Sequence, residues 1–86
     1  MDPYKILLYP MMGEKATMLR EKGNILTFIV DKKSNKKEIK EAVELLYTIK
    51  VLSINTVISP NGKKKAHIKL DPKYSAEEIV SQFGIM

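Results

Sequence analysis

The segment DKKSNKKEIKEAVELLY, residues Asp31 to Tyr47, predicts the helix around which this fold is built. Its apolar side chains recur at the three- and four-residue spacing that forms one stripe of an α-helix, namely Ile39, Ala42, Val43, Leu46 and Tyr47. Asn35 is the expected N-cap, because its side chain can accept a hydrogen bond from the backbone N–H of Glu38 while Glu38 reaches back. We therefore expect an amphipathic helix lying on a core, with its glutamates mostly on the solvated outer face.

Four lysines crowd the start of this helix, at positions 32, 33, 36 and 37. A helix N-terminus carries partial positive charge, so each cation there costs roughly 0.3 to 1 kcal/mol. The free backbone N–H groups at the same end can bind phosphate, and lysines would assist them. Because local electrostatics disfavours the arrangement and no structural gain is evident, the pattern indicates a phosphate-binding site.

The basic residues of the whole chain fall into two blocks. The formal net charge is +5, and residues 32–40 contain five lysines and one acid, whereas residues 63–69 contain four lysines and no acid. Two such blocks, if adjacent at one end of a sheet, indicate a polyanionic partner. The alternative is that the lysines are solvent-facing charges that only confer solubility.

Length and composition exclude several classes of protein. Eighty-six residues, taken as residues 1–86, predict a single domain with a thin core. There is no cysteine, and the single histidine, His67, cannot complete a metal site, so no metal or cofactor is expected. His67 is either a surface histidine or a nucleic-acid contact. No serine or threonine has a plausible base beside it and no glycine-rich phosphate loop occurs, so we expect no enzyme and no small-molecule substrate.

No segment predicts membrane association. The start, MDPYKILLYP, has too short an apolar core for a signal peptide, and no run approaches about 18 apolar residues. We expect a cytoplasmic protein.

The first half of the chain predicts a strand, a helix and a second strand. Lys5 to Tyr9 is a short apolar run between prolines, which is typical of an edge strand. Glu14 to Lys22 is expected to be helical, with Gly23 ending the helix. Asn24 to Val30 is almost continuously apolar, as a central strand covered on both faces would be.

The second half adds two strands and a helix after the organising helix. Val51 to Ile58 alternates, which places Val51 on one face and Ile54 on the other. The turn Ser59 to Gly62 leads to a return strand at Lys64 to Leu70, with Ala66, Ile68 and Leu70 toward the core and Lys65, His67 and Lys69 on the other face. Ser75 is the expected N-cap of a last helix, from Ala76 to Phe83.

These elements predict an α+β fold of order β-α-β-α-β-β-α, with one mostly antiparallel sheet and three helices packed on it. No strand carries the paired exposed aromatics of an RNA-recognition motif, so stacking on single-stranded bases is disfavoured. Phosphate and ribose contacts to folded, double-helical RNA are the expected mode.

The chain resembles a known family over nearly its whole length: the archaeal form of the universal large-subunit ribosomal protein L twenty-three, which borders the polypeptide exit tunnel. The matching segments occur in order and at the right spacing. They are Tyr4-Lys5 through Pro10, Glu14-Lys15-Ala16, Leu26 to Asp31, Lys36 with Ile39-Lys40 and Ala42, Val51 with Ile54-Asn55-Thr56, Pro60, Gly62, Lys64 to Ala66, and Tyr74-Ser75-Ala76.

The resemblance implies a sheet of order 1-2-4-3 and a place in the cytoplasmic large ribosomal subunit. Its implied partners are domain III of the large-subunit ribosomal RNA, ribosomal protein L twenty-nine and the signal recognition particle, with Glu14 in the docking surface for that particle. The positions that match the family at expected RNA contacts are Lys15, Lys36, Lys40, Asn55, Thr56, Lys64 and Lys65. The two basic blocks add Lys32, Lys33, Lys63 and Lys69.

Two departures from the family pattern affect these expectations. Gly13 stands where the family usually has threonine or serine before the Glu-Lys pair, which weakens the expected cap of the first helix. The turn Ser59 to Gly62 is too short to form the tunnel loop of bacterial members. Two competing functions stay open: a free-standing protein-interaction module, or a small enzyme of similar architecture.

Overall fold

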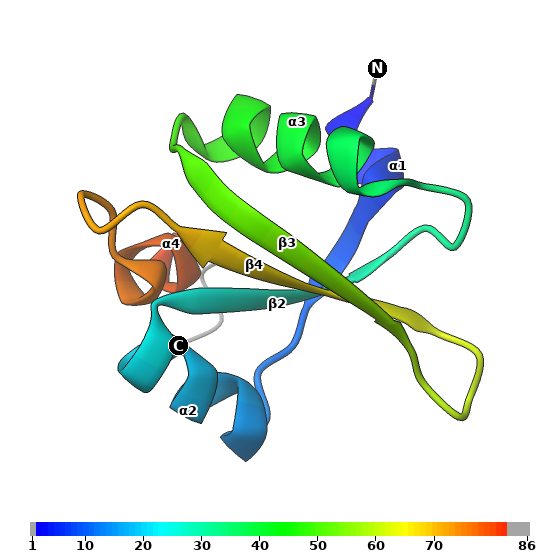
Figure 1. Cartoon of the computed structure of the whole chain (residues 1–86), viewed down its shortest axis with the longest axis horizontal. Coiled ribbons are helices and arrows are strands. Elements are labelled where there is room, and N and C mark those ends of the chain that lie inside the picture. The colour runs from blue at the N-terminus through cyan, green and yellow to red at the C-terminus, as the bar shows by residue number, and fades with distance from the viewer. Residues whose placement is uncertain (1, 83–86) are drawn as a thin grey trace.

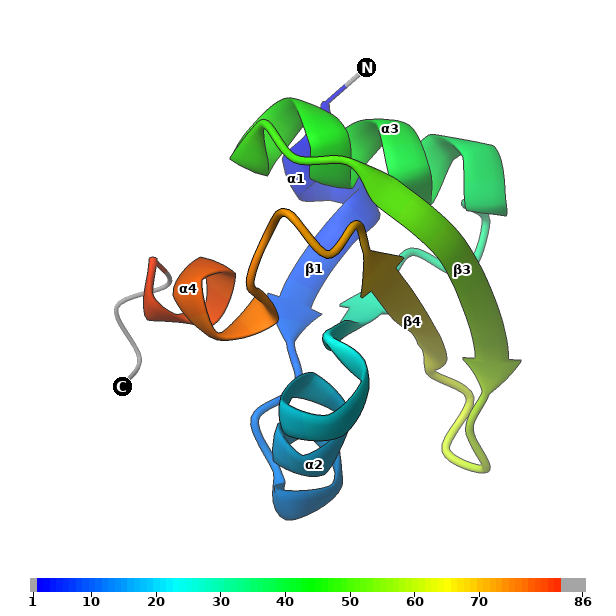
Figure 2. The ribbon, with the colours of Figure 1, turned by 60° about the vertical axis from the view of Figure 1, so that its left-hand side comes forward.

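A computed structural model describes residues 2–82 and shows one sheet between helices (Figure 1). The elements in chain order are α1 (Pro3–Ile6), β1 (Leu7–Pro10), α2 (Glu14–Gly23), β2 (Ile25–Val30), α3 (Lys36–Tyr47), β3 (Val51–Ile58), β4 (Lys64–Leu70) and α4 (Ala76–Ser81). Helices α3 and α2 lie on opposite sides of the sheet (Figure 2). The α+β class is therefore confirmed.

The sheet order is β1-β2-β4-β3, and every neighbouring pair is antiparallel. This confirms the order that the family resemblance implies. β4 lies between β2 and β3, which are therefore parallel to each other and joined by α3. Because Val30 at the end of β2 pairs with Lys64 at the start of β4, the loop into α3 and the β3–β4 turn emerge at the same end of the sheet.

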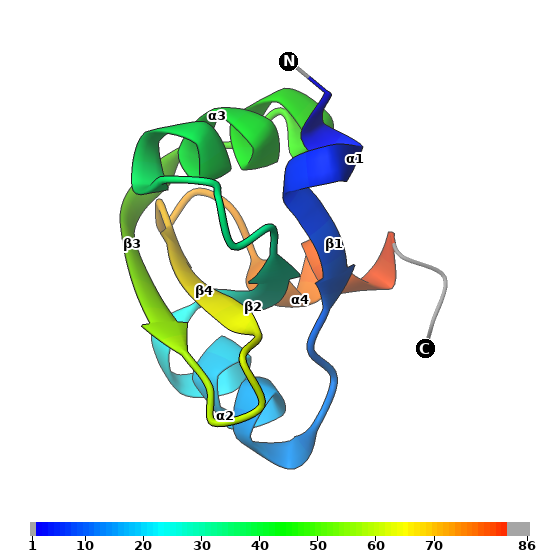
Figure 3. The same cartoon turned by 90° about the vertical axis from the view of Figure 1, so that its right-hand side faces the viewer.

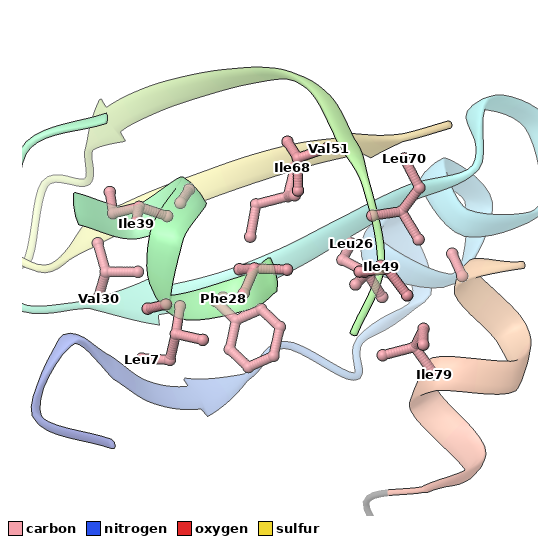
Figure 4. Close-up of a cluster of buried hydrophobic side chains, with 14 of the residues drawn as sticks. Leu7, Leu26, Phe28, Val30, Ile39, Ile49, Val51, Ile68, Leu70 and Ile79 are labelled. Atoms are coloured by element: carbon pink, nitrogen blue, oxygen red, sulfur yellow. The ribbon is translucent and has the colours of Figure 1, made fainter. Parts of the chain in front are cut away.

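The core lies between α3 and the sheet. Ile39, Ala42 and Val43 of α3 are fully buried, as are Ala66 and Ile68 of β4. Figure 4 shows side chains of the strands and α3 pointing toward one another in this layer. The predicted apolar stripe and the predicted inward face of β4 are both confirmed.

Helix α3 starts with the predicted capping box. Asn35 Oδ1 accepts from the backbone N–H of Glu38 at 2.8 Å, and Glu38 Oε1 accepts from the N–H of Asn35 at 3.0 Å. At the other end, Glu44 Oε2 accepts from the N–H of Val51 at 3.0 Å. The sequence predicted that Glu44 would be a solvated acid on the outer face. Its carboxylate instead joins the end of α3 to the start of β3.

The chain before β2 differs from the prediction in two places. Residues 3–6 form the helical turn α1, with Asp2 as its N-cap, so the edge strand begins at Leu7 rather than Lys5. Helix α2 includes Gly23, and Asn24, not glycine, takes the left-handed conformation at φ 54°. A Cβ at Gly23 would lie 2.9 Å from Ile25 Cδ1, so a larger residue there would require the end of the Ile25 side chain to shift.

Strand β3 does not alternate as predicted because it carries a bulge. Val51 pairs with Leu70 but Ser53 pairs with Lys69, which leaves one extra residue on β3. Val51 is buried and Ile54 also packs against the core, while Leu52 between them is 55% exposed. The prediction that Val51 and Ile54 face opposite sides is wrong.

The C-terminal elements follow the prediction in the described residues. Gly62 in the turn has φ 82°, and β4 runs over the predicted residues. Ser75 caps α4 by accepting from the N–H of Glu78 at 3.4 Å. The predicted end of this helix at Phe83 lies outside the described residues.

Asn24 joins α2, β4 and the segment before α4, so replacing it should destabilise the fold. Its side chain donates to Tyr74 O at 2.7 Å and accepts from Ala76 N–H at 2.7 Å. Each lost bond costs about 0.5 to 1.5 kcal/mol, and alanine, which tolerates the left-handed region less well than asparagine, adds about 1 kcal/mol. We expect Asn24→Ala to lower the free energy of unfolding by about 2 to 4 kcal/mol in urea denaturation.

The matched control is Asn24→Gly, which loses both bonds but adopts positive φ freely. It should be about 1 kcal/mol more stable than the alanine variant. Two variants that both unfold at the wild-type urea concentration would contradict this role of Asn24.

Candidate nucleic-acid interface

The two lysine blocks meet at the end of the sheet where β2 ends and β4 begins. Lys64 Nζ donates to the backbone oxygen of Ser34 at 2.6 Å, which joins β4 directly to the loop before α3. Lys32 lies over the turn, since a Cβ on Gly62 would be 3.3 Å from its Nζ. Figure 3 looks onto this end of the molecule. The predicted adjacency of the two blocks is thus present in the structure.

Four lysines line a cavity of about 360 Å³ at this end of the sheet, namely Lys32, Lys33, Lys63 and Lys64. We call the surface that these four lysines form the lysine end. The cavity is also lined by Leu8 and Tyr9 of the edge strand β1. Lys32, Lys33 and Lys63 are exposed, whereas Lys64 is half-buried. The lysine end therefore combines concentrated positive charge with a hollowed surface.

Tyr9 belongs to this end, although the sequence did not single it out. Lys63 Nζ donates to Tyr9 Oη at 2.9 Å and lies 5.5 Å from the ring centroid. Tyr9 is 42% exposed and borders a second cavity, of about 370 Å³, beneath the turn. Because Tyr9 lies in the apolar run of residues 5–9, the sequence predicted a packed strand residue. No local pattern indicated that its side chain would be exposed.

Lys36 and Lys40 lie apart from the lysine end. With Lys37 they line a cavity of about 230 Å³ against Ser53 and Ile54 of β3. All three lysines are exposed on α3. They extend the basic surface along the edge strand β3.

The remaining predicted contacts divide between the two faces of the sheet. Asn55 pairs with His67, whereas Thr56 pairs with the buried Ala66 on the α3 face. Successive strand residues point to opposite faces, so Asn55 and Thr56 cannot present their side chains on one surface. Asn55 shares its face with Lys65.

Two predicted residues lie away from the lysine end. Lys69 borders a cavity at the other end of β4, together with Glu21 and Glu77. Glu14 is exposed as the first residue of α2, after a Gly13 cap that makes no side-chain hydrogen bond. The structure does not bring either residue to the end of the sheet where Lys32, Lys33, Lys63 and Lys64 lie.

Within residues 2–82, no lysine of either block lies within ion-pair distance of a carboxylate. Within residues 2–82 the one ion pair joins Arg20 Nε to Glu77 Oε1 at 3.4 Å, between α2 and α4. In the same residues, no group of carboxylates and histidines could hold a metal ion, and no helix is long and apolar enough to cross a membrane. The ammonium groups are therefore available to an anion from outside the chain.

His67 lies on the α2 face of β4, near two further cations. Its Nδ1 is 3.2 Å from Thr27 Oγ1. Partial burial lowers the pKa of His67, and the charges of Lys15 and Lys65 lower it further. Burial and the two lysines therefore favour the neutral form of the imidazole.

Comparison with known proteins agrees with the resemblance found in the sequence. The family model of ribosomal protein L23 matches residues 5–77. The chain is also 42% identical over 85 residues to the large ribosomal subunit protein uL23 of Trypanosoma brucei brucei, which covers 99% of this chain and 52% of that relative. The chain thus spans about half the length of the curated relative. Since the family match covers most of the chain, the protein belongs to the ribosomal protein L23 family.

Proposed function

We propose that this chain is a structural constituent of the large subunit of the cytoplasmic ribosome and that it binds large-subunit ribosomal RNA. The observation that carries the proposal is that lysines of the two blocks meet at one end of the sheet and, within residues 2–82, form no ion pair with a carboxylate. Membership of a ribosomal protein family supports the same function and a structural role rather than an enzymatic one.

The lysine end binds RNA through phosphates. Lysine presents a point charge without the two-pronged donor geometry of arginine. Side chains cannot enter the deep, narrow major groove of an RNA double helix, so backbone contacts are available and base reading is not. The shape of the folded RNA then supplies the specificity, and the cavity bordered by Tyr9 offers space for a nucleotide beside the charges.

The finer partners follow from the family resemblance. We propose domain III of the large-subunit RNA as the binding site, close to the exit tunnel, and ribosomal protein L twenty-nine as a neighbour. Glu14, exposed at the start of α2, is proposed to contribute to the docking surface for the signal recognition particle. The alternative role for Glu14 is that of a first-turn acid that complements the helix dipole.

The competing function is a free-standing protein-interaction module whose lysines only confer solubility. RNA binding is supported because Lys32 and Lys33 of the first block share one cavity with Lys63 and Lys64 of the second block. An enzyme is disfavoured because ribosomal proteins of this family are structural rather than enzymatic.

Association with the ribosome is the first test. We expect mass spectrometry to find the chain in large subunits purified through a high-salt wash. In an assembled particle the folded RNA keeps many phosphate contacts in place at the same time, so the protein stays bound. A small-subunit ribosomal protein measured in the same preparation controls for contamination. Absence of the chain from washed large subunits would exclude the ribosomal function.

The salt dependence of RNA binding is the second test. If Lys36, Lys40, Lys64 and Lys65 each neutralise one phosphate, log K against log salt should have a slope of roughly −3 to −4, at about 0.7 to 0.9 per contact. Lys36→Gln should weaken binding to all RNAs of similar shape and reduce that slope by about one unit. Asn55→Ala should lower affinity without changing the slope, since a neutral side chain releases no counterion.

The matched control is Lys73→Gln, which removes an exposed lysine beyond the far end of β4. It should bind a domain III transcript with wild-type affinity and slope. If the Lys36 and Lys64 variants also keep the wild-type slope, the lysine blocks act as solubility charges.

The role of Glu14 is a third test. Glu14→Gln should weaken binding of the signal recognition particle to ribosomes that contain the variant, while subunit assembly stays normal. Glu21→Gln, an exposed acid in the last turn of the same helix, serves as the control. Unchanged particle binding would assign Glu14 to the helix dipole alone.

A further inference from the structure

A cleft of about 170 Å³ lies between α2 and the sheet, on the face opposite α3. Its polar groups come from three elements: Lys15 of α2, Thr27 of β2, and Lys65 and His67 of β4. We call this cleft, with its four polar lining residues, the α2 cleft. Met11 and Lys65 also line the cavity beneath the β3–β4 turn, so the α2 cleft adjoins the lysine end.

We propose that the α2 cleft binds a backbone phosphate of the RNA, with His67 as a ligand that becomes protonated when the phosphate enters. The proposal rests on the RNA-binding function above and extends its interface around the sheet to a second face. It assigns a role to the chain's single histidine.

The composition of the α2 cleft suits an anion. Two ammonium groups and an imidazole converge there, and among the described residues no carboxylate lines it. Since a water molecule occupies about 30 Å³, the cleft has room for a phosphate group with some of its hydration. Apolar walls, such as Leu19 and Val57, lower the local dielectric and strengthen the attraction between phosphate and cations.

The position of His67 leaves one ring nitrogen for a ligand. Nδ1 lies 3.2 Å from Thr27 Oγ1, while Nε2 has no hydrogen-bond partner within residues 2–82. The charged groups that face the ring are cations, Lys15 from α2 and Lys65 on its own strand. Its partners across the sheet are neutral, Thr27 on β2 and Asn55 on β3.

The electrostatics couples phosphate binding to proton uptake. In the free protein, burial and the two lysines lower the pKa of His67 below its ordinary value of 6.5. A phosphate offsets the charge of the lysines and favours the imidazolium, so the pKa of His67 is higher in the complex. Binding then takes up a proton, and affinity rises as the pH falls from above the bound pKa to below the free one.

The first experiment measures affinity for a domain III transcript from pH 5.5 to 8 at constant salt. Wild-type affinity should rise about three- to tenfold toward pH 5.5, within the limit of tenfold per pH unit for one proton. His67→Gln should match wild type at pH 8 and show no rise. Lys36→Gln, outside the α2 cleft, should bind more weakly at every pH but keep the rise. A flat wild-type profile, or a rise that survives in His67→Gln, would overturn the proposal.

The second experiment separates this inference from the proposed function. NMR titration of the one imidazole, in sulfate and in chloride at matched ionic strength, uses sulfate as a phosphate mimic without a proton to lose in this range. Sulfate should raise the pKa of His67, and Lys15→Gln should abolish the increase. If the transcript does not bind at any pH, the RNA-binding function fails, and this titration decides the anion cleft by itself: an unchanged pKa excludes it.

Discussion

The packing of α3 against β4 is the constraint on which the rest of the structure depends. β4 has a neighbour on each edge, and its inward residues Ala66 and Ile68 are fully buried beneath the apolar stripe of α3. A strand in this position forces β2 and β3 to run parallel, with α3 crossing over it to join them. The loop into α3 and the β3–β4 turn must then emerge at one end of the sheet. For that reason the two lysine blocks become neighbours although they are distant in the sequence. Lys64 of the second block bonds to Ser34, which lies within the first block and 30 residues earlier.

Local patterns were sufficient to predict most elements and the core face of α3. The apolar spacing of residues 39–47, the cap at Asn35 and the alternation of residues 64–70 each depend on interactions within one helix or strand. Strand order has no such local signal, because alternation specifies which face of a strand is buried but not which strand lies beside it. The order 1-2-4-3 came from the family resemblance and is confirmed by the pairing.

The differences from the sequence prediction arise from partners distant in the chain. Asn24 adopts positive φ because its side chain bonds to Tyr74 and Ala76, about fifty residues away. The bulge in β3 follows from pairing with β4, since it allows both Val51 and Ile54 to reach the core. The placement of Lys69 has the same origin: it belongs to a lysine block in sequence, but a strand of seven residues carries it to the opposite end of the sheet.

The lysine end combines an ordered backbone with lysines that form no ion pair within residues 2–82, and this combination suits phosphate binding. Ser34 is buried, and its hydroxyl and N–H both donate to Asp31 O, while its own carbonyl accepts from Lys64. Asp31 Oδ1 accepts from the N–H of Lys33 at 3.3 Å, so the loop that carries Lys32 and Lys33 is held by its own hydrogen bonds. Fixing the backbone of one residue costs about 1 to 2 kcal/mol, and a preformed loop avoids that loss on binding. Under the proposed function, bound phosphates would relieve the repulsion among the lysines, so the charge pattern that opposes the start of α3 would favour the complex.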